Sequence, residues 1–296
     1  MSASQRIVIV GAAGRLGAAL LRKYARDRHV VGLSRSQLDL SDPASFGKIL
    51  GALEFDVLIN CAAQTNVDRC ETEPNEAFAL NAEAPQALAE VCAQKKARLV
   101  HISTDYVFDG AKSERYTEED EANPISVYGE SKLEGERRVL AVSSDHLVVR
   151  VSWVFGPDRP SFIDWIIQQA REKESVAAVA DKFSTPSYTL DIAEMLRPLL
   201  EARTSGIVHV ANGGQCSWRE YGQWALDCCR AEGVSLRAQT VDAISLAEMK
   251  QFVARRPAHS VLATEKYEGA TGQQPRAWQA AVRAYVRDHV ATSLRQ

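Results

Sequence analysis

Short apolar runs recur through the first half of the chain. Ile7–Val10, Val30–Leu33 and Asp56–Ile59 are brief and rich in β-branched residues, and Arg98–Ser103 and His146–Val151 resemble them. Runs of this length without polar alternation are typical of strands buried on both faces of a parallel sheet. The pattern therefore predicts five strands.

The segments between these runs show the spacing of amphipathic helices. Leu16 and Leu20 lie on one side of a helix predicted over Gly14–Arg26, and further helices are predicted over Pro74–Ala93 and Val127–Val142. Strands separated by helices form right-handed βαβ units. We therefore predict an α/β fold with a Rossmann-type, doubly wound parallel sheet.

The second half of the chain is less regular. It predicts one strand, Gly206–Ala211, and four helices, Phe162–Glu172, Asp191–Glu201, Trp218–Glu232 and Ala277–Val290. We expect residues 1–150 to form the NAD(P)-binding domain. Residues 151–296 are expected to form mainly a smaller C-terminal substrate-binding lobe, with some segments returning to the first domain. Such a lobe would cover the carboxyl ends of the strands, where doubly wound sheets bind ligands.

Composition narrows the partners. The 296 residues carry a net charge of −3 and no basic block interleaved with aromatics, which argues against nucleic acid. No apolar run reaches the roughly 18 residues of a membrane span, and the polar start is unlike a signal peptide. We expect a cytoplasmic protein without a membrane partner. The six cysteines and six histidines show no metal-ligand spacing, so no metal site is predicted.

A glycine-rich loop joins the first strand to the first helix. Gly11, Gly14 and Gly17 form a G-x-x-G-x-x-G sequence. Glycines permit a tight turn and close approach to a pyrophosphate, whose charge the helix N-terminus favours. The predicted cofactor-binding residues of this loop are Gly11, Ala13, Gly14, Arg15, Leu16 and Gly17.

The end of the second strand bears on the choice of cofactor. An NAD site usually has an acidic residue there, whereas this chain has Ser34 and Arg35. Arg35 and Arg15 are candidates to bind a 2′-phosphate, and Asp39 and Leu40 to border the adenine. We predict NADPH as cofactor, with NADH as the alternative.

A tyrosine and a lysine stand one helical turn apart. Tyr128 and Lys132 share one helix face, where an ammonium would lower the pKa of the phenol. The tyrosine would then give a proton to a carbonyl oxygen while hydride reaches the carbon. A hydroxyl of Ser103 or Thr104, at the end of the fourth strand, could hold that oxygen. Cys61, Ala62 and Ala63, which follow the third strand, are small residues suited to close cofactor contact.

Together these stretches resemble the extended short-chain dehydrogenases, and among them the dTDP-4-dehydrorhamnose reductases. The resemblance covers nearly the whole chain, at residues 11–17, 60–68, 73–74, 80–81, 103–110, 128–132, 150–154 and 255–257. It implies an NADPH-dependent reductase that converts dTDP-4-dehydro-L-rhamnose to dTDP-L-rhamnose. The resemblance is also compatible with a homodimer.

The resemblance implies a role for individual residues. Tyr128 would be the proton donor, Lys132 would bind the nicotinamide ribose, and Thr104 would polarise the sugar carbonyl. Asp105 and Trp153 would line the sugar pocket. Ala62, Ala63 and Ser103 would border the cofactor.

Several features leave alternatives open. Arg255 and Arg256 either clamp the substrate diphosphate, for which we select Arg256, or are solvated loop charges. The chain departs from the family pattern at Ser161, at Ser184–Ser187 and at Arg15, which puts the exact sugar in doubt. Another sugar-nucleotide epimerase or reductase on this scaffold is one alternative. A non-catalytic NADP-binding regulatory subunit is another.

Overall fold

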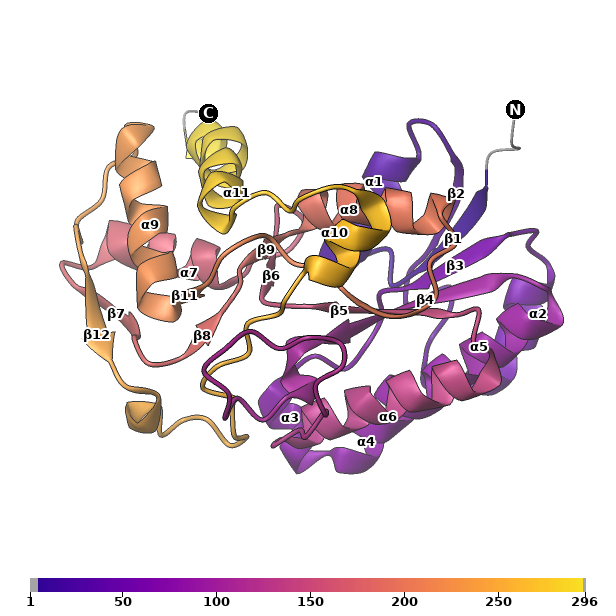
Figure 1. Cartoon of the computed structure of the whole chain (residues 1–296). Coiled ribbons are helices and arrows are strands. Elements are labelled where there is room, and N and C mark those ends of the chain that lie inside the picture. The colour runs from indigo at the N-terminus through magenta and orange to yellow at the C-terminus, as the bar shows by residue number, and fades with distance from the viewer. Residues whose placement is uncertain (1–4, 295–296) are drawn as a thin grey trace.

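A six-stranded parallel sheet forms the centre of the molecule. The computed structural model describes residues 5–294 (Figure 1). The strands, in spatial order, are β10 (Gly206–His209), β5 (Leu147–Val151), β4 (Arg98–Thr104), β3 (Val57–Asn60), β1 (Arg6–Val10) and β2 (His29–Leu33). All neighbouring pairs are parallel. The predicted Rossmann-type sheet is therefore confirmed.

Helices cover both faces of this sheet, as Figure 1 shows. Ile7 and Ile9 of β1 pack on the side of α1 (Arg15–Tyr24) and α8 (Thr189–Glu201). Val8 and Val10 point to the opposite side, as alternate residues of a strand must. The helices on that side are α2 (Phe46–Gly51), α3 (Val67–Thr72), α4 (Pro74–Phe78), α5 (Ala84–Gln94) and α6 (Val127–Val142).

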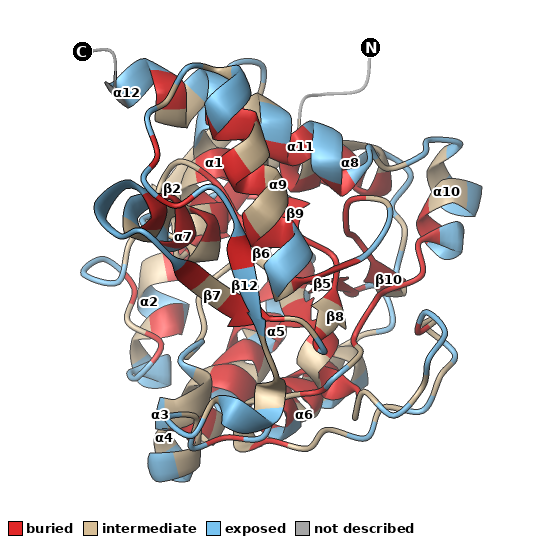
Figure 2. Ribbon diagram, turned by 90° about the vertical axis from the view of Figure 1, so that its left-hand side faces the viewer, coloured by how far each residue is buried: buried red, intermediate tan, exposed pale blue. Residues whose placement is uncertain are grey.

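A second core lies beyond one end of the sheet. Its centre is a cluster of buried residues that includes Phe155, Ile166 and Tyr221. The elements of this half are β6 (Val154–Phe155), α7 (Phe162–Glu172), β7 (Val176–Val179), β8 (Phe183–Ser184), β9 (Ser187–Tyr188), β11 (Cys216–Ser217), α9 (Trp218–Ala231), β12 (Val241–Ile244), α11 (Trp278–Tyr285) and α12 (Thr292–Leu294). Helix α10 (Glu265–Thr271) instead packs on the sheet, where its Tyr267 joins the cluster of α1 and α8. Figure 2 shows that the helices of the second core turn exposed residues outward and buried ones inward.

The short strands β6, β8, β9 and β11 were not predicted from the sequence. Each has only two residues, too few to show a period, and each is defined by its pairing with a distant segment. Within the described range, 5–294, no helix is both long and apolar enough to cross a membrane.

The predicted helix over Pro74–Ala93 is interrupted. A π-helical turn over Ala79–Glu83 separates α4 from α5. Pro85 has no N–H to donate to the carbonyl of Asn81, so the regular α-helical bond is missing at this point. That carbonyl instead lies against Gly135 of α6, where an added Cβ would come within 2.1 Å of the Asn81 oxygen.

This close approach generates a stability prediction. Gly135→Ala should lower the free energy of unfolding by about 1–3 kcal/mol, because the methyl group pushes α6 away from the π turn. Gly47→Ala is the matched control: an added Cβ there meets no atom within 4 Å. Because Gly47 lies in helix α2, this substitution should leave the free energy of unfolding unchanged or raise it by about 0.4–1 kcal/mol. Urea denaturation of both variants measures the difference, and equal midpoints would contradict the packing argument.

Candidate active site

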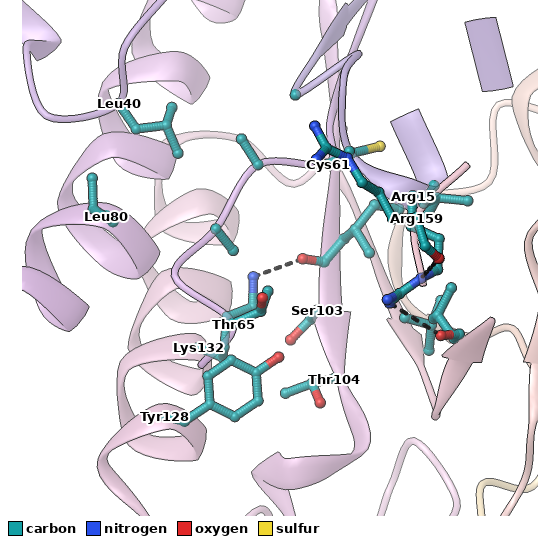
Figure 3. Close-up of a pocket in the computed structure, with 18 of the residues that line it drawn as sticks. Arg15, Leu40, Cys61, Thr65, Leu80, Ser103, Thr104, Tyr128, Lys132 and Arg159 are labelled. Atoms are coloured by element: carbon teal, nitrogen blue, oxygen red, sulfur yellow. Dashed lines mark hydrogen bonds between the residues drawn. The ribbon is translucent and has the colours of Figure 1, made fainter. Parts of the chain in front are cut away.

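A cavity of about 630 Å³ opens where the loops that follow strands β1 to β5 converge (Figure 3). Most of the predicted site residues line it: Gly11, Ala13, Gly14, Arg15, Leu16, Arg35, Asp39, Leu40, Cys61, Ala62, Ala63, Ser103, Thr104, Asp105, Tyr128, Lys132 and Trp153. Gly17, Ser34 and Arg256 are not among its lining residues. The lining residues that were not predicted include Thr65, Leu80, Tyr106 and Arg159.

The glycine loop is packed so tightly that side chains are excluded. Gly11 has φ +79°, and a Cβ on it would lie 2.8 Å from the backbone nitrogen of Ala62. A Cβ on Gly17 would lie 2.2 Å from the Gly11 oxygen, so Gly17 acts by shaping the loop from behind. Helix α1 starts after Gly14 without a side-chain cap. Free backbone N–H groups and this cradle fit the pyrophosphate of a dinucleotide.

The two arginines predicted for a 2′-phosphate lie in different places. Arg35 is exposed and forms a 3.1 Å ion pair with Asp39, a weak surface contact that leaves its guanidinium accessible. Arg15 donates to the carbonyl oxygens of Arg159 at 3.2 Å and Val154 at 3.3 Å. It therefore joins α1 to the segment after β6, beside Arg159 (Figure 3). Both arginines line the cavity, but the guanidinium of Arg15 is held by these carbonyls and that of Arg35 is accessible.

Helix α6 carries the tyrosine and the lysine. The Ser126 hydroxyl caps α6 by accepting a hydrogen bond from the Gly129 N–H at 3.2 Å. This cap fixes the first turn of the helix, which carries Tyr128. Figure 3 shows the Tyr128 hydroxyl pointing towards Ser103 and Thr104. Burial raises the pKa of Tyr128, and the Thr104 hydroxyl opposes that rise.

Lys132 is buried beneath this tyrosine. Its Nζ donates to the Ile102 carbonyl at 2.7 Å and lies 3.2 Å from Nε2 of His101. Burial lowers the pKa of Lys132 to about 8, and Glu136 opposes that shift. The predicted lowering of the Tyr128 pKa by Lys132 is not found in this geometry, because the amine turns to the strand instead.

The buried carboxylate of Asp105 accepts a hydrogen bond from Thr104. One carboxylate oxygen accepts from Ser152 at 3.0 Å and Ser260 at 2.6 Å, and the other from Thr104 at 3.2 Å. Burial raises the pKa of Asp105, and Lys182 opposes that shift. The carboxylate therefore orients the threonine hydroxyl as well as lining the cavity.

Trp153 forms part of the opposite wall. Its backbone has φ +41°, a left-handed conformation that is costly for a large side chain. The indole is fixed by ring contacts with Tyr221 at 4.7 Å, Phe162 at 5.4 Å and Trp218 at 5.5 Å between centroids. The second core thus holds a cavity residue in a strained position.

Arg256, which is predicted to clamp a diphosphate, does not line the cavity and is already paired with a carboxylate. Its guanidinium lies 2.7 Å from Asp68 at the start of α3 and 3.5 Å from the Phe252 ring centroid. Asp68 also accepts from the N–H groups of Val253 and Ala254, each at 2.9 Å. Arg256 therefore fastens the segment over 252–257 to the first half of the chain.

Asn81 supports the site without lining the cavity, and it was not among the predicted site residues. Its amide donates to the Gln64 carbonyl and to Ser131 of α6, each at 3.0 Å, and its Oδ1 accepts from the Gln64 N–H at 2.8 Å. It joins the loop after β3 to the helix of Tyr128. The sequence feature that could have pointed to Asn81 is Pro85, four residues later, which breaks the regular helix and indicates the π turn.

A doubly wound sheet, a glycine loop at the first helix and a Tyr–Lys pair facing a threonine define the extended short-chain dehydrogenase/reductase class. The chain matches the RmlD substrate binding domain over residues 5–291. The dTDP-4-dehydrorhamnose reductase of Aggregatibacter actinomycetemcomitans is 35% identical over 291 residues, which cover 95% of this chain and 99% of the relative. That of Mycobacterium tuberculosis is 38% identical over 286 residues, 94% and 91% of the two chains.

Solved structures agree. The dTDP-4-dehydrorhamnose reductase of Bacillus anthracis in complex with NADP superposes with a TM-score of 0.91 at 28% identity, over 96% of this chain and 99% of that one. The Clostridium acetobutylicum reductase gives a TM-score of 0.91 at 31% identity, over 98% and 100%. The chain therefore belongs to the dTDP-4-dehydrorhamnose reductase family.

The Asp68 contacts generate a prediction about the 252–257 segment. Asp68→Ala should increase the rate of tryptic cleavage after the exposed Arg255 by about tenfold, because charged hydrogen bonds worth about 1.5–3 kcal/mol are lost. Asp242→Ala, which changes an exposed aspartate of β12, is the control. Unchanged cleavage in the Asp68 variant would show that the segment is held by other contacts.

Proposed function

We propose that this protein reduces the 4-keto group of a dTDP-linked 6-deoxy sugar, dTDP-4-dehydro-L-rhamnose in the first instance, with NADPH. The observation that carries the proposal is the meeting of Tyr128, Thr104 and the glycine loop around one cavity. The names of the relatives, and the NADP held by the Bacillus anthracis reductase, support it.

The side chains of the cavity suit this reduction. The cofactor, when bound, supplies hydride to the carbonyl carbon. The Tyr128 hydroxyl would donate to the carbonyl oxygen and pass its proton to it. The Thr104 hydroxyl, which donates to Asp105 in this structure, would turn to donate to the same oxygen. A protonated Lys132 would favour the resulting phenolate. Asp105 would accept the hydrogen bond of the Thr104 hydroxyl until substrate binds and so hold that side chain beside the cavity.

The cofactor and the sugar nucleotide would occupy different parts of the cavity. The predicted cofactor set, from Gly11 to Leu16 and from Cys61 to Ala63, would hold the pyrophosphate and the nicotinamide half. Trp153 would pack against the sugar ring. Because Arg256 is engaged with Asp68, we assign it no part in binding the diphosphate. A homodimer is a further proposal, which light scattering of the purified chain would test.

Cofactor choice gives the first prediction of this proposal. Arg35→Ala should raise the KM for NADPH about tenfold, because a charged hydrogen bond to the 2′-phosphate is lost, and should leave the KM for NADH nearly unchanged. Arg26→Ala removes an exposed cation from the turn after α1 and serves as control. Steady-state kinetics with both cofactors measure the effect. Equal losses with NADPH and NADH would contradict a phosphate contact.

Substrate and mechanism are tested together. Loss of NADPH absorbance should report turnover of dTDP-4-dehydro-L-rhamnose in a panel that also holds UDP- and GDP-linked 4-keto sugars.

Tyr128→Phe keeps the ring and should reduce kcat by about 10²–10⁴-fold while NADPH binding, followed by its fluorescence, persists. No turnover of any 4-keto sugar nucleotide, and no calorimetric binding of dTDP, would favour the regulatory-subunit alternative.

A further inference from the structure

A buried histidine stands behind the catalytic lysine and has no part in the proposed reaction so far. His101 on β4 is fully buried between Asn60 of β3 and Lys132 of α6. Its Nδ1 lies 3.2 Å from Nδ2 of Asn60, and its Nε2 lies 3.2 Å from Nζ of Lys132. The three side chains therefore form one chain of hydrogen-bonding groups across the sheet.

The orientation of Asn60 decides the direction of these bonds. Its Oδ1 accepts from the backbone N–H of Ala62 at 3.1 Å. Exchanging the amide oxygen and nitrogen would set an NH₂ group against that N–H, leaving both donors without an acceptor. The NH₂ group of Asn60 therefore donates to Nδ1 of His101. Because Nδ1 accepts, the neutral imidazole carries its proton on Nε2.

The Nε2–H of His101 then points at Nζ of Lys132. That nitrogen already donates to the Ile102 carbonyl at 2.7 Å. An ammonium has no lone pair with which to accept a second bond, whereas an amine has one. The hydrogen bonds are complete only when Lys132 is uncharged.

The other groups around Lys132 act in both directions. Burial disfavours the ammonium and holds the pKa of Lys132 at about 8, whereas the Glu136 carboxylate and the Cys61 thiol favour the ammonium. Tyr128 lies one turn before it on the same helix. Burial holds the pKa of His101 well below its ordinary range, which keeps the imidazole neutral.

We propose that His101 is a positioning residue that, through a tautomer set by Asn60, favours the uncharged amine of Lys132 and so lowers the pH at which this lysine loses its charge in the enzyme without cofactor. The inference deepens the proposed function, since Lys132 must be charged to favour the Tyr128 phenolate. Ala62, which orients Asn60, borders the predicted cofactor site. The charge of the lysine is thereby linked to the loop on which the cofactor would rest.

The tautomer is measured directly, without any assay of activity. In ¹⁵N-histidine-labelled protein free of cofactor, long-range ¹H–¹⁵N correlation should show His101 with a protonated Nε2 and a bare Nδ1. The signal is assigned by its loss in His101→Gln. A protonated Nδ1, or a doubly protonated imidazole at neutral pH, would overturn the proposal whatever the enzyme reduces.

Two substitutions test the consequence for catalysis. Asn60→Asp requires Nδ1 to carry the proton and turns a lone pair of His101 towards Lys132. His101→Gln offers Lys132 a carbonyl oxygen. Both favour the ammonium, so the basic limb of the kcat/KM profile should move up by about one pH unit.

The double variant separates a relay from general damage. If Asn60 acts through His101, Asn60→Asp should add little further shift in the His101→Gln background. A purely structural role would lower kcat at every pH and leave the limb in place, which would overturn the proposal. If the parent enzyme turns over no 4-keto sugar, the proposed function fails, and the labelled-histidine spectrum still tests His101.

Discussion

A buried ion pair between α6 and the sheet determines where the catalytic side chains lie. Arg150 of β5 and Glu136 of α6 meet at 2.7 Å with side chains 3% and 1% exposed, and Ser103 of β4 donates to the same carboxylate. Removing one partner of such a pair typically costs about 3–5 kcal/mol, because the other charge is left buried alone. Lys132 lies one turn before Glu136, and Thr104 follows Ser103. The ion pair therefore sets both the helix and the strand that carry the reacting groups.

The same helix is held from its other side by a different kind of contact. Gly135 lets the backbone of the π turn approach, and Asn81 of that turn bonds to Ser131. The ion pair fixes α6 against the sheet, whereas the π turn fixes it against the loop beside the cofactor site. Neither contact touches the cavity, yet together they set the position of Tyr128.

The sequence was sufficient to predict those parts of the site whose residues lie close together along the chain. The loop from Gly11 to Gly17 and the Tyr128–Lys132 spacing each lie within one turn or one helix, so they could be recognised in the sequence. The contacts of Arg15 and Arg256 could not, because their partners are distant in the chain, the Val154–Pro160 segment and Asp68. A charged side chain shows its chemistry in the sequence, but not the acceptor that folding brings to it.

The departures from the family pattern also have structural explanations. Ser161 forms a capping box with Asp164 at the start of α7, donating to that carboxylate through its N–H and its hydroxyl. Ser184 is buried in β8, which pairs with β11, and Ser187 is buried in β9, which pairs with β6. These serines belong to the framework of the second core, so a comparison of pocket shape between relatives should begin with the aromatic residues around Trp153.

The position of β10 has a consequence for the order of folding during synthesis. This strand lies beside β5 at the edge of the sheet, although most elements of the second core that precede it in the chain, from β6 to β9, lie elsewhere. A ribosome delivering the chain from its N-terminus releases five strands of the sheet well before the sixth. Until β10 arrives, β5 presents an open hydrogen-bonding edge to other nascent chains. The six-stranded sheet is thus completed only after the elements from β6 to α8 have been made.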